Sequence, residues 1–231
     1  VTVRLIAARE RAIQAFKPEE YWTITAELET EKQESFAAEL REKGGETYVP
    51  ANAEQAHAVV AVLQGATFTV EALEEKRLKK HPPPPFTTST LQQEAGNKLG
   101  FSVKQTMVIA QQLYEGVNLG KGQGQTGLIT YMRTDSVHLS KKALEDAATV
   151  IAKLYGREYV LTTPRIYKTK SKMAQEAHEA IRPTEMHRTP ESLRDALDDQ
   201  QRKLYTMIWN RTVATQMPAA ELKRVSADIA A

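Results

Sequence analysis

The sequence predicts an α+β fold with a β-rich part first and a mainly helical part second. Residues 21–28 alternate apolar and polar side chains with the period of two that a half-buried strand has. After the four prolines Pro82–Pro85, apolar residues recur at the spacing of helices instead. Because proline fixes φ and favours an extended chain, this run is the clearest boundary between the two parts.

The composition describes a globular chain and excludes several kinds of chemistry. With 231 residues, 41% of them hydrophobic and 26% charged, the chain can bury a core in one large or two modest domains. It has no cysteine, which excludes disulfides, cysteine-ligated zinc and thiol catalysis and suits a reducing cytoplasm. The net charge of +2 permits a polyanionic partner without requiring one.

The first part of the chain contains a helix and then short strands. Helical spacing over residues 1–16 stops before Pro18, which indicates the end of a helix. Residues 34–40 form a second strand that can pair with 21–28. Gly44-Gly45 then makes a turn before a short strand at 47–49.

One helix and a third strand complete this part. Asn52, followed by Gln55, is a helix N-cap with a reciprocal partner, and Gly65 ends that helix. Residues 67–73 again look like a strand, before a charged run leads to the prolines.

The second part begins with two helices in tandem. Ser89 with Gln92 has the spacing of a capping box, and Gly100 supplies the stop. Apolar residues over 103–114 then keep helical spacing on one face. Two short helices followed by a strand are typical of a winged helix, although helical bundles contain the same pair.

The remaining segments are a loop, two helices and a final strand. The glycine-rich residues 118–126 match no phosphate-binding fingerprint and predict a hairpin-like loop. Ser140 caps a helix through Ile151, and Thr189-Pro190 opens another that continues through Ile208. Residues 221–230 predict a strand that returns to the first part.

The segment from Gly127 to Leu139 contains a candidate nucleophile. Tyr131 ends an apolar run, Arg133 follows two residues later and Asp135 two beyond that. If residues 127–131 form a buried strand, Tyr131 and Arg133 project to the same side. A phenol is inert at neutral pH unless a cation stabilises its anion, and attack on a phosphodiester builds negative charge that the same cation can balance. Alternatively, Tyr131 packs on the core and Arg133 pairs with Asp135.

Three blocks of sequence together resemble bacterial type IA DNA topoisomerase I. They are Pro-Phe-Thr-Thr-Ser-Thr-Leu-Gln-Gln-Glu-Ala at 85–95, Tyr-Met-Arg-Thr-Asp-Ser at 131–136 and Ala-Gln-Glu-Ala-His-Glu-Ala-Ile-Arg-Pro at 174–183. The resemblance implies that Tyr131 forms a transient 5′-phosphotyrosyl bond, that Arg133 contacts the scissile phosphate and that His178 lies on the DNA-facing side.

Several further residues are candidates for DNA contact or support. Thr88, Ser89 and Thr90 can donate hydroxyls to phosphates at a helix N-terminus. Helix capping is the simpler explanation, and both roles can hold because one hydroxyl can cap while its neighbour faces DNA. Arg182 is held extended by the following proline, which would aim it outward toward DNA. Thr130 and Asp135 flank the candidate site as supporting residues.

The resemblance also implies a domain organisation. Residues 1–17 correspond to the tail of domain IV, 18–80 to the first segment of a β-rich hinge domain (domain II), and 81–217 to a helical, winged-helix-like domain III that carries Tyr131. Residues 218–231 return to domain II.

Magnesium is expected outside this chain. The family's Mg²⁺-binding Asp-x-Asp-x-Glu cluster lies in a Toprim domain, and no such cluster occurs here. The isolated His178 beside two glutamates has too few ligands at matched spacing for a metal site, so we expect no metal ligand in this chain. Because the sequence starts without methionine, we expect a piece of a longer polypeptide.

The predicted function is therefore that of part of a DNA topoisomerase. In the intact enzyme, Tyr131 would cut one strand of negatively supercoiled DNA, a second strand would pass, and the break would be resealed without ATP. We expect single-stranded or negatively supercoiled DNA as partner, together with the Toprim domain and the rest of domain IV of the same polypeptide. We expect a monomer that is cytoplasmic, associated with the nucleoid and not bound to a membrane. This chain alone should cut no DNA. The alternative is a non-catalytic DNA-binding module with a winged-helix-like domain.

Overall fold

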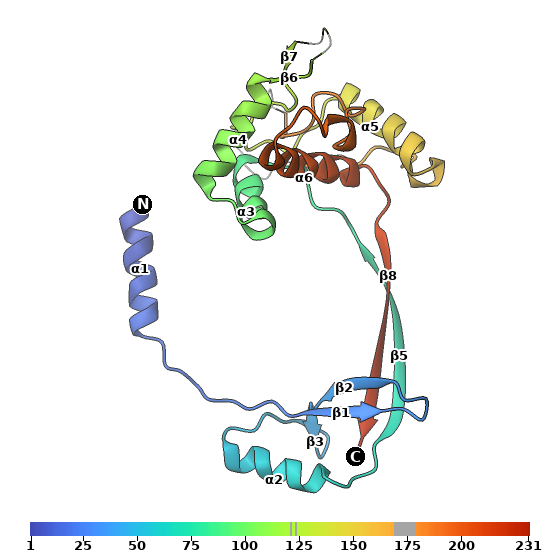
Figure 1. Ribbon diagram of the computed structural model, residues 1–231. Coiled ribbons are helices and arrows are strands. Elements are labelled where there is room, and N and C mark those ends of the chain that lie inside the picture. Colours follow the sequence, from blue (N-terminus) through green and yellow to red (C-terminus); the bar gives the residue numbers. More distant parts are fainter. Residues whose placement is uncertain (121, 123, 169–178) are drawn as a thin grey trace. The chain divides into compact units, whose positions relative to one another are not determined.

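The computed structural model describes residues 1–120, 122, 124–168 and 179–231. It contains both helices and strands, as predicted (Figure 1). The chain forms two compact units, the first made of residues 1–76 with 224–231 and the second of residues 77–223.

The first unit contains the predicted pair of strands. Strand β1 (Thr25–Glu29) pairs antiparallel with β2 (Ser35–Glu39), which confirms the pairing although β1 starts later than predicted. Strands β3 (Glu42–Lys43) and β4 (Glu46–Thr47) form a second hairpin. The turn between them is Gly44-Gly45, where both residues have the positive φ that glycine adopts without strain.

Two helices complete this unit. Helix α1 (Thr2–Gln14) buries none of its residues. Helix α2 (Ala53–Leu63) begins as predicted at Asn52, whose side-chain oxygen accepts from the Gln55 backbone N–H at 2.9 Å. A small core forms where α2 meets the chain before β1; its buried members are Ile24, Ala56 and Val59.

Strands β5 (Thr69–Lys80) and β8 (Ala220–Ala230) pair with each other as a two-stranded ribbon (Figure 1). The predicted return strand is therefore confirmed. The expectation that the earlier strand ends near residue 73 is wrong, because β5 continues through the charged run. Every side chain of β5 is exposed, so this strand needs no apolar alternation, and β8 pairs with the backbone groups along one of its edges.

The second unit is mainly helical. Its elements are α3 (Thr88–Leu99), α4 (Val103–Glu115), β6 (Val117–Asn118), β7 (Gln125–Thr126), α5 (Lys141–Leu154), the 3₁₀ turns η1 (Arg157–Tyr159) and η2 (Glu191–Leu193), and α6 (Asp199–Thr215). The tandem helices, the hairpin at 118–126 and the Ser140 cap of α5 are confirmed. Within the described ranges, no helix is long and apolar enough to cross a membrane.

Two boundaries in this unit differ from the prediction. Helix α3 is capped by Thr87, which exchanges hydrogen bonds with Thr90, and the pair Ser89 and Gln92 does not form the capping box. Residues 189–208 are not one helix. The chain turns after η2, and Asp198 starts α6 with a new capping box. In both places a neighbouring Thr or Asp satisfies the free N–H groups of the helix.

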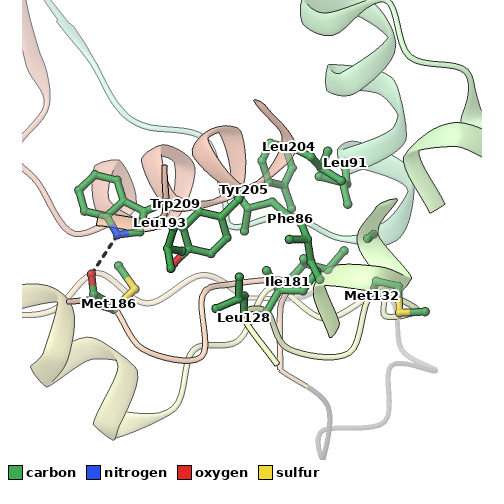
Figure 2. Packing of buried hydrophobic residues seen from close by; sticks show 14 of the residues in the cluster. Phe86, Leu91, Leu128, Met132, Ile181, Met186, Leu193, Leu204, Tyr205 and Trp209 are labelled. Carbon is green, nitrogen blue, oxygen red and sulfur yellow. Dashed lines mark hydrogen bonds between the residues drawn. The ribbon is translucent and has the colours of Figure 1, made fainter. Parts of the chain in front are cut away.

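Helix α6 is central to the core of the second unit. It buries Leu204, Tyr205, Ile208 and Trp209. Figure 2 shows the Trp209 indole N–H directed at the Met186 carbonyl, at 2.9 Å. Segments far apart in sequence supply the remaining large core side chains, among them Phe86, Leu91, Leu128, Met132 and Ile181.

The proline segment is attached to this core. The Arg211 guanidinium lies 4.3 Å from the centre of the Phe86 ring, donates to the Pro84 carbonyl at 3.1 Å and pairs with Glu94. Tyr167 donates its hydroxyl to the Pro82 carbonyl at 2.9 Å. The proline segment after β5 is therefore fixed to the second unit by hydrogen bonds from side chains to two of its carbonyls.

Candidate active site around Tyr131

The segment that carries Tyr131 alternates between buried and exposed side chains. Tyr131, Arg133 and Asp135 are exposed, whereas Met132, Thr134 and Ser136 are buried. Residues 127–131 are not the continuous strand we predicted, because only Ile129 among them forms a β-bridge, with Pro183. The chain bends at Thr130, Met132 and Arg133, and it leaves Tyr131 and Arg133 exposed on either side of the buried Met132.

Thr88, the first residue of α3, holds this segment from one side. Its backbone N–H donates to the Thr134 carbonyl at 2.9 Å, and its hydroxyl accepts from the Thr134 N–H at 2.9 Å. The same hydroxyl lies 2.8 Å from the Met132 carbonyl. These contacts connect the start of a helix to the residues on both sides of Arg133.

Thr130 holds the segment from the other side. Its N–H donates to the Arg182 carbonyl at 2.9 Å, and its hydroxyl donates to the Ala180 carbonyl at 2.6 Å. The Arg182 N–H in turn donates to the Thr130 hydroxyl at 3.0 Å. Thr130 therefore fixes the backbone immediately before Tyr131.

Arg182 does not point outward, so that expectation is wrong. Its side chain is only 12% exposed and pairs with Glu179 at 2.5 Å. It also donates to the Pro183 carbonyl at 2.7 Å. The proline restricts the backbone before it, as expected, but the long side chain folds back because a carboxylate lies within reach.

Glu179 connects this pair to α5. It accepts from the Ser140 backbone N–H at 2.7 Å, at the start of that helix. Burial alone would raise the pKa of the Glu179 carboxyl, but hydrogen bonds from Ser140 and Arg182 and the positive charge of Arg182 outweigh burial and lower this pKa. Glu179 is therefore an ionised partner that ties residues 179–182 to the rest of the second unit.

Tyr131 itself is open to solvent on one side and has an aromatic neighbour on another. Its side chain is 42% exposed. Its ring lies 5.3 Å from that of Tyr114 on α4, centre to centre, with 63° between the ring planes. Among the described residues, no hydrogen bond or ion pair engages the Arg133 side chain, so the alternative pairing with Asp135 does not form there.

Ser89 and Thr90 lie on the same helix end as Thr88, and both are exposed. The Thr87 hydroxyl is 3.2 Å from that of Ser89 and 3.1 Å from that of Thr90. Because Thr88 contacts Met132 and Thr134, this helix end lies next to the Tyr131 segment. A DNA-binding role for these hydroxyls stays a prediction.

Two other expectations concern His178 and metal ligands. His178 lies outside the described residues. In the part of the chain that the structure describes, no group of three or more His, Cys, Asp or Glu side chains is placed to hold a metal ion. The expectation that Mg²⁺ binds outside this chain stays a prediction.

Sequence reasoning missed two contacts at this site. It treated Tyr114 only as a member of an apolar helical face, and it did not connect Glu179 with Arg182. The three-residue spacing of Glu179 and Arg182 was a usable signal for an ion pair. Nothing in the sequence indicated the Tyr114 contact, because the hairpin between α4 and Gly127 brings the two rings together.

Comparison with known proteins gives one consistent result. A family model described as DNA topoisomerase matches residues 1–231. DNA topoisomerase 1 of Rickettsia felis is 48% identical over 233 residues, covering 100% of this chain and 30% of the relative. The Campylobacter jejuni protein of the same name is 44% identical and covers 94% of this chain and 31% of the relative.

A solved structure is similar along almost the whole chain. Full-length topoisomerase I from Thermotoga maritima superposes with a TM-score of 0.75 and 37% sequence identity. The match covers 98% of this chain and 34% of that one. The chain thus spans about a third of the length of the proteins that it matches.

Proposed function

Because the chain belongs to the bacterial DNA topoisomerase family, we propose that Tyr131 is the nucleophile of a type IA enzyme. The phenol oxygen of Tyr131 attacks a phosphodiester of one DNA strand. A bond from this oxygen to phosphorus forms, the bond from phosphorus to the 3′ oxygen breaks, and the proton lost by the phenol balances the one gained by the 3′-hydroxyl. The reverse reaction reseals the strand, and no ATP is needed because the covalent link conserves the bond energy.

The observation that carries this proposal is the exposed pair Tyr131 and Arg133. Both project from a segment whose alternate residues, Met132 and Thr134, are buried. A backbone fixed by Thr88 and Thr130 limits how far the two side chains can drift apart. Preorganised groups of this kind contribute more to catalysis than groups that must be ordered during the reaction.

Arg133 would bind the non-bridging oxygens of the scissile phosphate. A guanidinium presents a planar fork of N–H donors, which matches two phosphate oxygens at once. Arg133 has no partner among the described side chains, so its donors are available for such a ligand. Its positive charge would also balance the negative charge that builds up on the phosphate during attack.

The other candidates divide into DNA contacts and supports. We propose that Ser89 and Thr90 donate hydroxyls to a neighbouring phosphate, where the N-terminal end of α3 attracts anions. Because the Arg182 guanidinium is engaged with Glu179, we assign it to support of the Tyr131 segment. His178 keeps the DNA-facing role that the resemblance implies, and Asp135 keeps its supporting role, both as predictions.

The chain would act as one part of a longer enzyme. The rest of that enzyme would supply a Toprim domain, the remainder of domain IV and the Mg²⁺ site, and the intact enzyme would carry out strand passage. We propose a monomeric protein in the cytoplasm, associated with the nucleoid. Alone, the chain should bind single-stranded DNA weakly and cut nothing. That binding should weaken with salt, with a log–log slope of about 0.7 per phosphate contact.

The test is capture of the covalent intermediate. An oligonucleotide labelled at its 3′ end is incubated with the full-length enzyme and Mg²⁺, and the mixture is separated under denaturing conditions. A labelled protein band is expected for the wild type and for the control Tyr159→Phe, whose tyrosine lies in the separate turn η1. Tyr131→Phe should give no band and no relaxation of supercoiled DNA.

Two results would contradict the proposal. Relaxation by purified Tyr131→Phe enzyme would exclude Tyr131 as the nucleophile. A wild type that binds DNA but never forms the adduct would favour the non-catalytic DNA-binding module.

A further inference from the structure

The C-terminal end of α4 is fixed against the chain that leads into Tyr131. The Leu113 carbonyl accepts from the Leu128 backbone N–H at 2.7 Å. A Cβ on Gly127 would lie 2.6 Å from the Tyr114 carbonyl oxygen, so only glycine allows the two backbones to come this close. The backbone of Tyr114 is therefore held against Gly127, which lies four residues before Tyr131 in the sequence.

This attachment brings the two rings together. They form a T-shaped pair with centres 5.3 Å apart and planes at 63°. The quadrupoles of aromatic rings favour such an arrangement. Tyr114 and Tyr131 are 41% and 42% exposed, so solvent surrounds much of both rings.

An exposed tyrosine can populate more than one staggered rotamer. In an aqueous site, Tyr131 would then point at the phosphate for only part of the time. The ring of Tyr114, carried by α4, blocks the Tyr131 rotamers that would overlap with it. It stabilises the Tyr131 rotamer in which the two rings are in contact. Small errors of placement are costly for a nucleophile, which reacts only near the correct geometry.

We infer that Tyr114 is a positioning residue for Tyr131, acting through ring contact and without touching the reacting atoms. This inference rests on the proposed role of Tyr131 as the nucleophile. It requires the ring of Tyr114 and does not require its hydroxyl. The rival explanation is a direct contact of the Tyr114 hydroxyl with DNA, and it requires the hydroxyl.

The kinetic test uses the full-length enzyme under single-turnover conditions with saturating single-stranded DNA. Tyr114→Ala should slow formation of the covalent adduct about three- to tenfold, the range expected for loss of one edge-to-face pair. Its Kd for DNA should be unchanged. Tyr114→Phe should restore the wild-type rate, and Tyr114→Leu, which keeps bulk without a ring, should not.

Matched controls separate this inference from a general loss of stability. Tyr159→Ala removes a tyrosine of similar exposure, 45%, from η1 and should leave the rate unchanged. A wild-type rate for Tyr114→Ala would overturn the inference. A Tyr114→Phe variant that forms the adduct as slowly as Tyr114→Ala would also overturn it, because the effect would then come from the hydroxyl and not from the ring.

A second measurement is independent of catalysis. In this chain labelled at tyrosine, nuclear Overhauser effects should connect the ring protons of Tyr114 and Tyr131. The Tyr131 ring signals should shift in Tyr114→Leu, which removes the ring current, and remain in place in Tyr159→Leu. Unshifted Tyr131 signals in Tyr114→Leu would exclude the ring contact even if Tyr131 proves to be the nucleophile.

A failure of the proposed function looks different. If Tyr131→Phe still forms the adduct, the nucleophile has been wrongly assigned, whatever the ring signals show. If Tyr131→Phe forms none while Tyr114→Ala reacts at the wild-type rate, the nucleophile is correct and the positioning role is wrong.

Discussion

Three hydrogen bonds join Thr88 and Thr134. The Thr88 backbone N–H donates to the Thr134 carbonyl at 2.9 Å, and the Thr88 hydroxyl accepts from the Thr134 N–H at 2.9 Å and donates to the Thr134 carbonyl at 3.1 Å. The two residues are 46 positions apart in sequence. Through this contact, the first turn of α3 sets the position of the chain on which Tyr131 and Arg133 stand. A single hydroxyl group is therefore important for the geometry of the candidate site.

Removal of that hydroxyl should destabilise the second unit. In Thr88→Val the Thr134 N–H loses its acceptor, and leaving a buried donor unsatisfied costs about 1–3 kcal/mol. For a chain of this size we expect Tm to fall by about 2–10 °C. The unfolding can be followed by the fluorescence of buried Trp209 in a Trp22→Phe background. Thr88→Ser keeps the hydroxyl and should stay close to wild type; equal losses in both variants would contradict this role.

Replacement of Arg133 by lysine should impair cleavage strongly although the positive charge is retained. An ammonium is a point charge and cannot match two phosphate oxygens with a planar fork, so we expect adduct formation to slow about ten- to a hundredfold. Tm should not change, because Arg133 has no ion-pair partner among the described side chains. The control is Arg194→Lys, because Arg194 is an exposed arginine at the C-cap of η2. Cleavage by Arg133→Lys at the wild-type rate would exclude the phosphate contact.

The Glu179–Arg182 pair should make stability depend on acid pH. The pKa of the folded-state Glu179 carboxyl lies below its ordinary value of 4.5, so the ionised form stabilises the fold. This contribution is complete well above pH 4.5 and is lost as the pH falls through the lowered folded-state pKa. At pH 7, Glu179→Gln leaves Arg182 without its counter-charge and should cost about 1–3 kcal/mol.

The measurement compares wild type and Glu179→Gln by denaturant unfolding between pH 7 and pH 3. The difference in unfolding free energy should shrink as the pH falls below 4.5. Glu145→Gln is the control, because its carboxylate is 65% exposed and lies 3.9 Å from Lys141, where an ion pair contributes little. A Glu179→Gln difference that stays constant with pH would contradict an ionised, stabilising carboxylate.

Two glycines should respond oppositely to alanine. A Cβ on Gly127 would lie 2.6 Å from the Tyr114 carbonyl oxygen, so Gly127→Ala must separate α4 from the Tyr131 segment. We expect a loss of about 1–3 kcal/mol, typical of overpacking, and slower cleavage. Gly96→Ala, inside α3 with its nearest contact at 3.7 Å, should stabilise by about 0.5–1 kcal/mol. Thermal unfolding of both variants checks this, and a tolerated Gly127→Ala would contradict the close approach.

Local sequence determined much of this fold. The pairing of β1 with β2, the Asn52 and Ser140 caps and the stop at Gly100 each depend on residues close together in the chain. Such features follow from side-chain periodicity and from capping groups within three residues of a helix start. The sequence also predicted that Tyr131 and Arg133 form the candidate site, and the structure leaves both residues exposed; their roles stay a prediction.

Tertiary structure decided the surroundings of that pair. Arg182 turned inward because Glu179 and two carbonyls lie within its reach, and β5 continued through a charged run because β8 supplied its hydrogen bonds. The contacts of Tyr131 with Tyr114, and of Thr134 with Thr88, join residues that only the folded chain brings together. Periodicity predicts which way a side chain faces, but it carries no information about which distant group it meets, since that depends on packing of the whole unit.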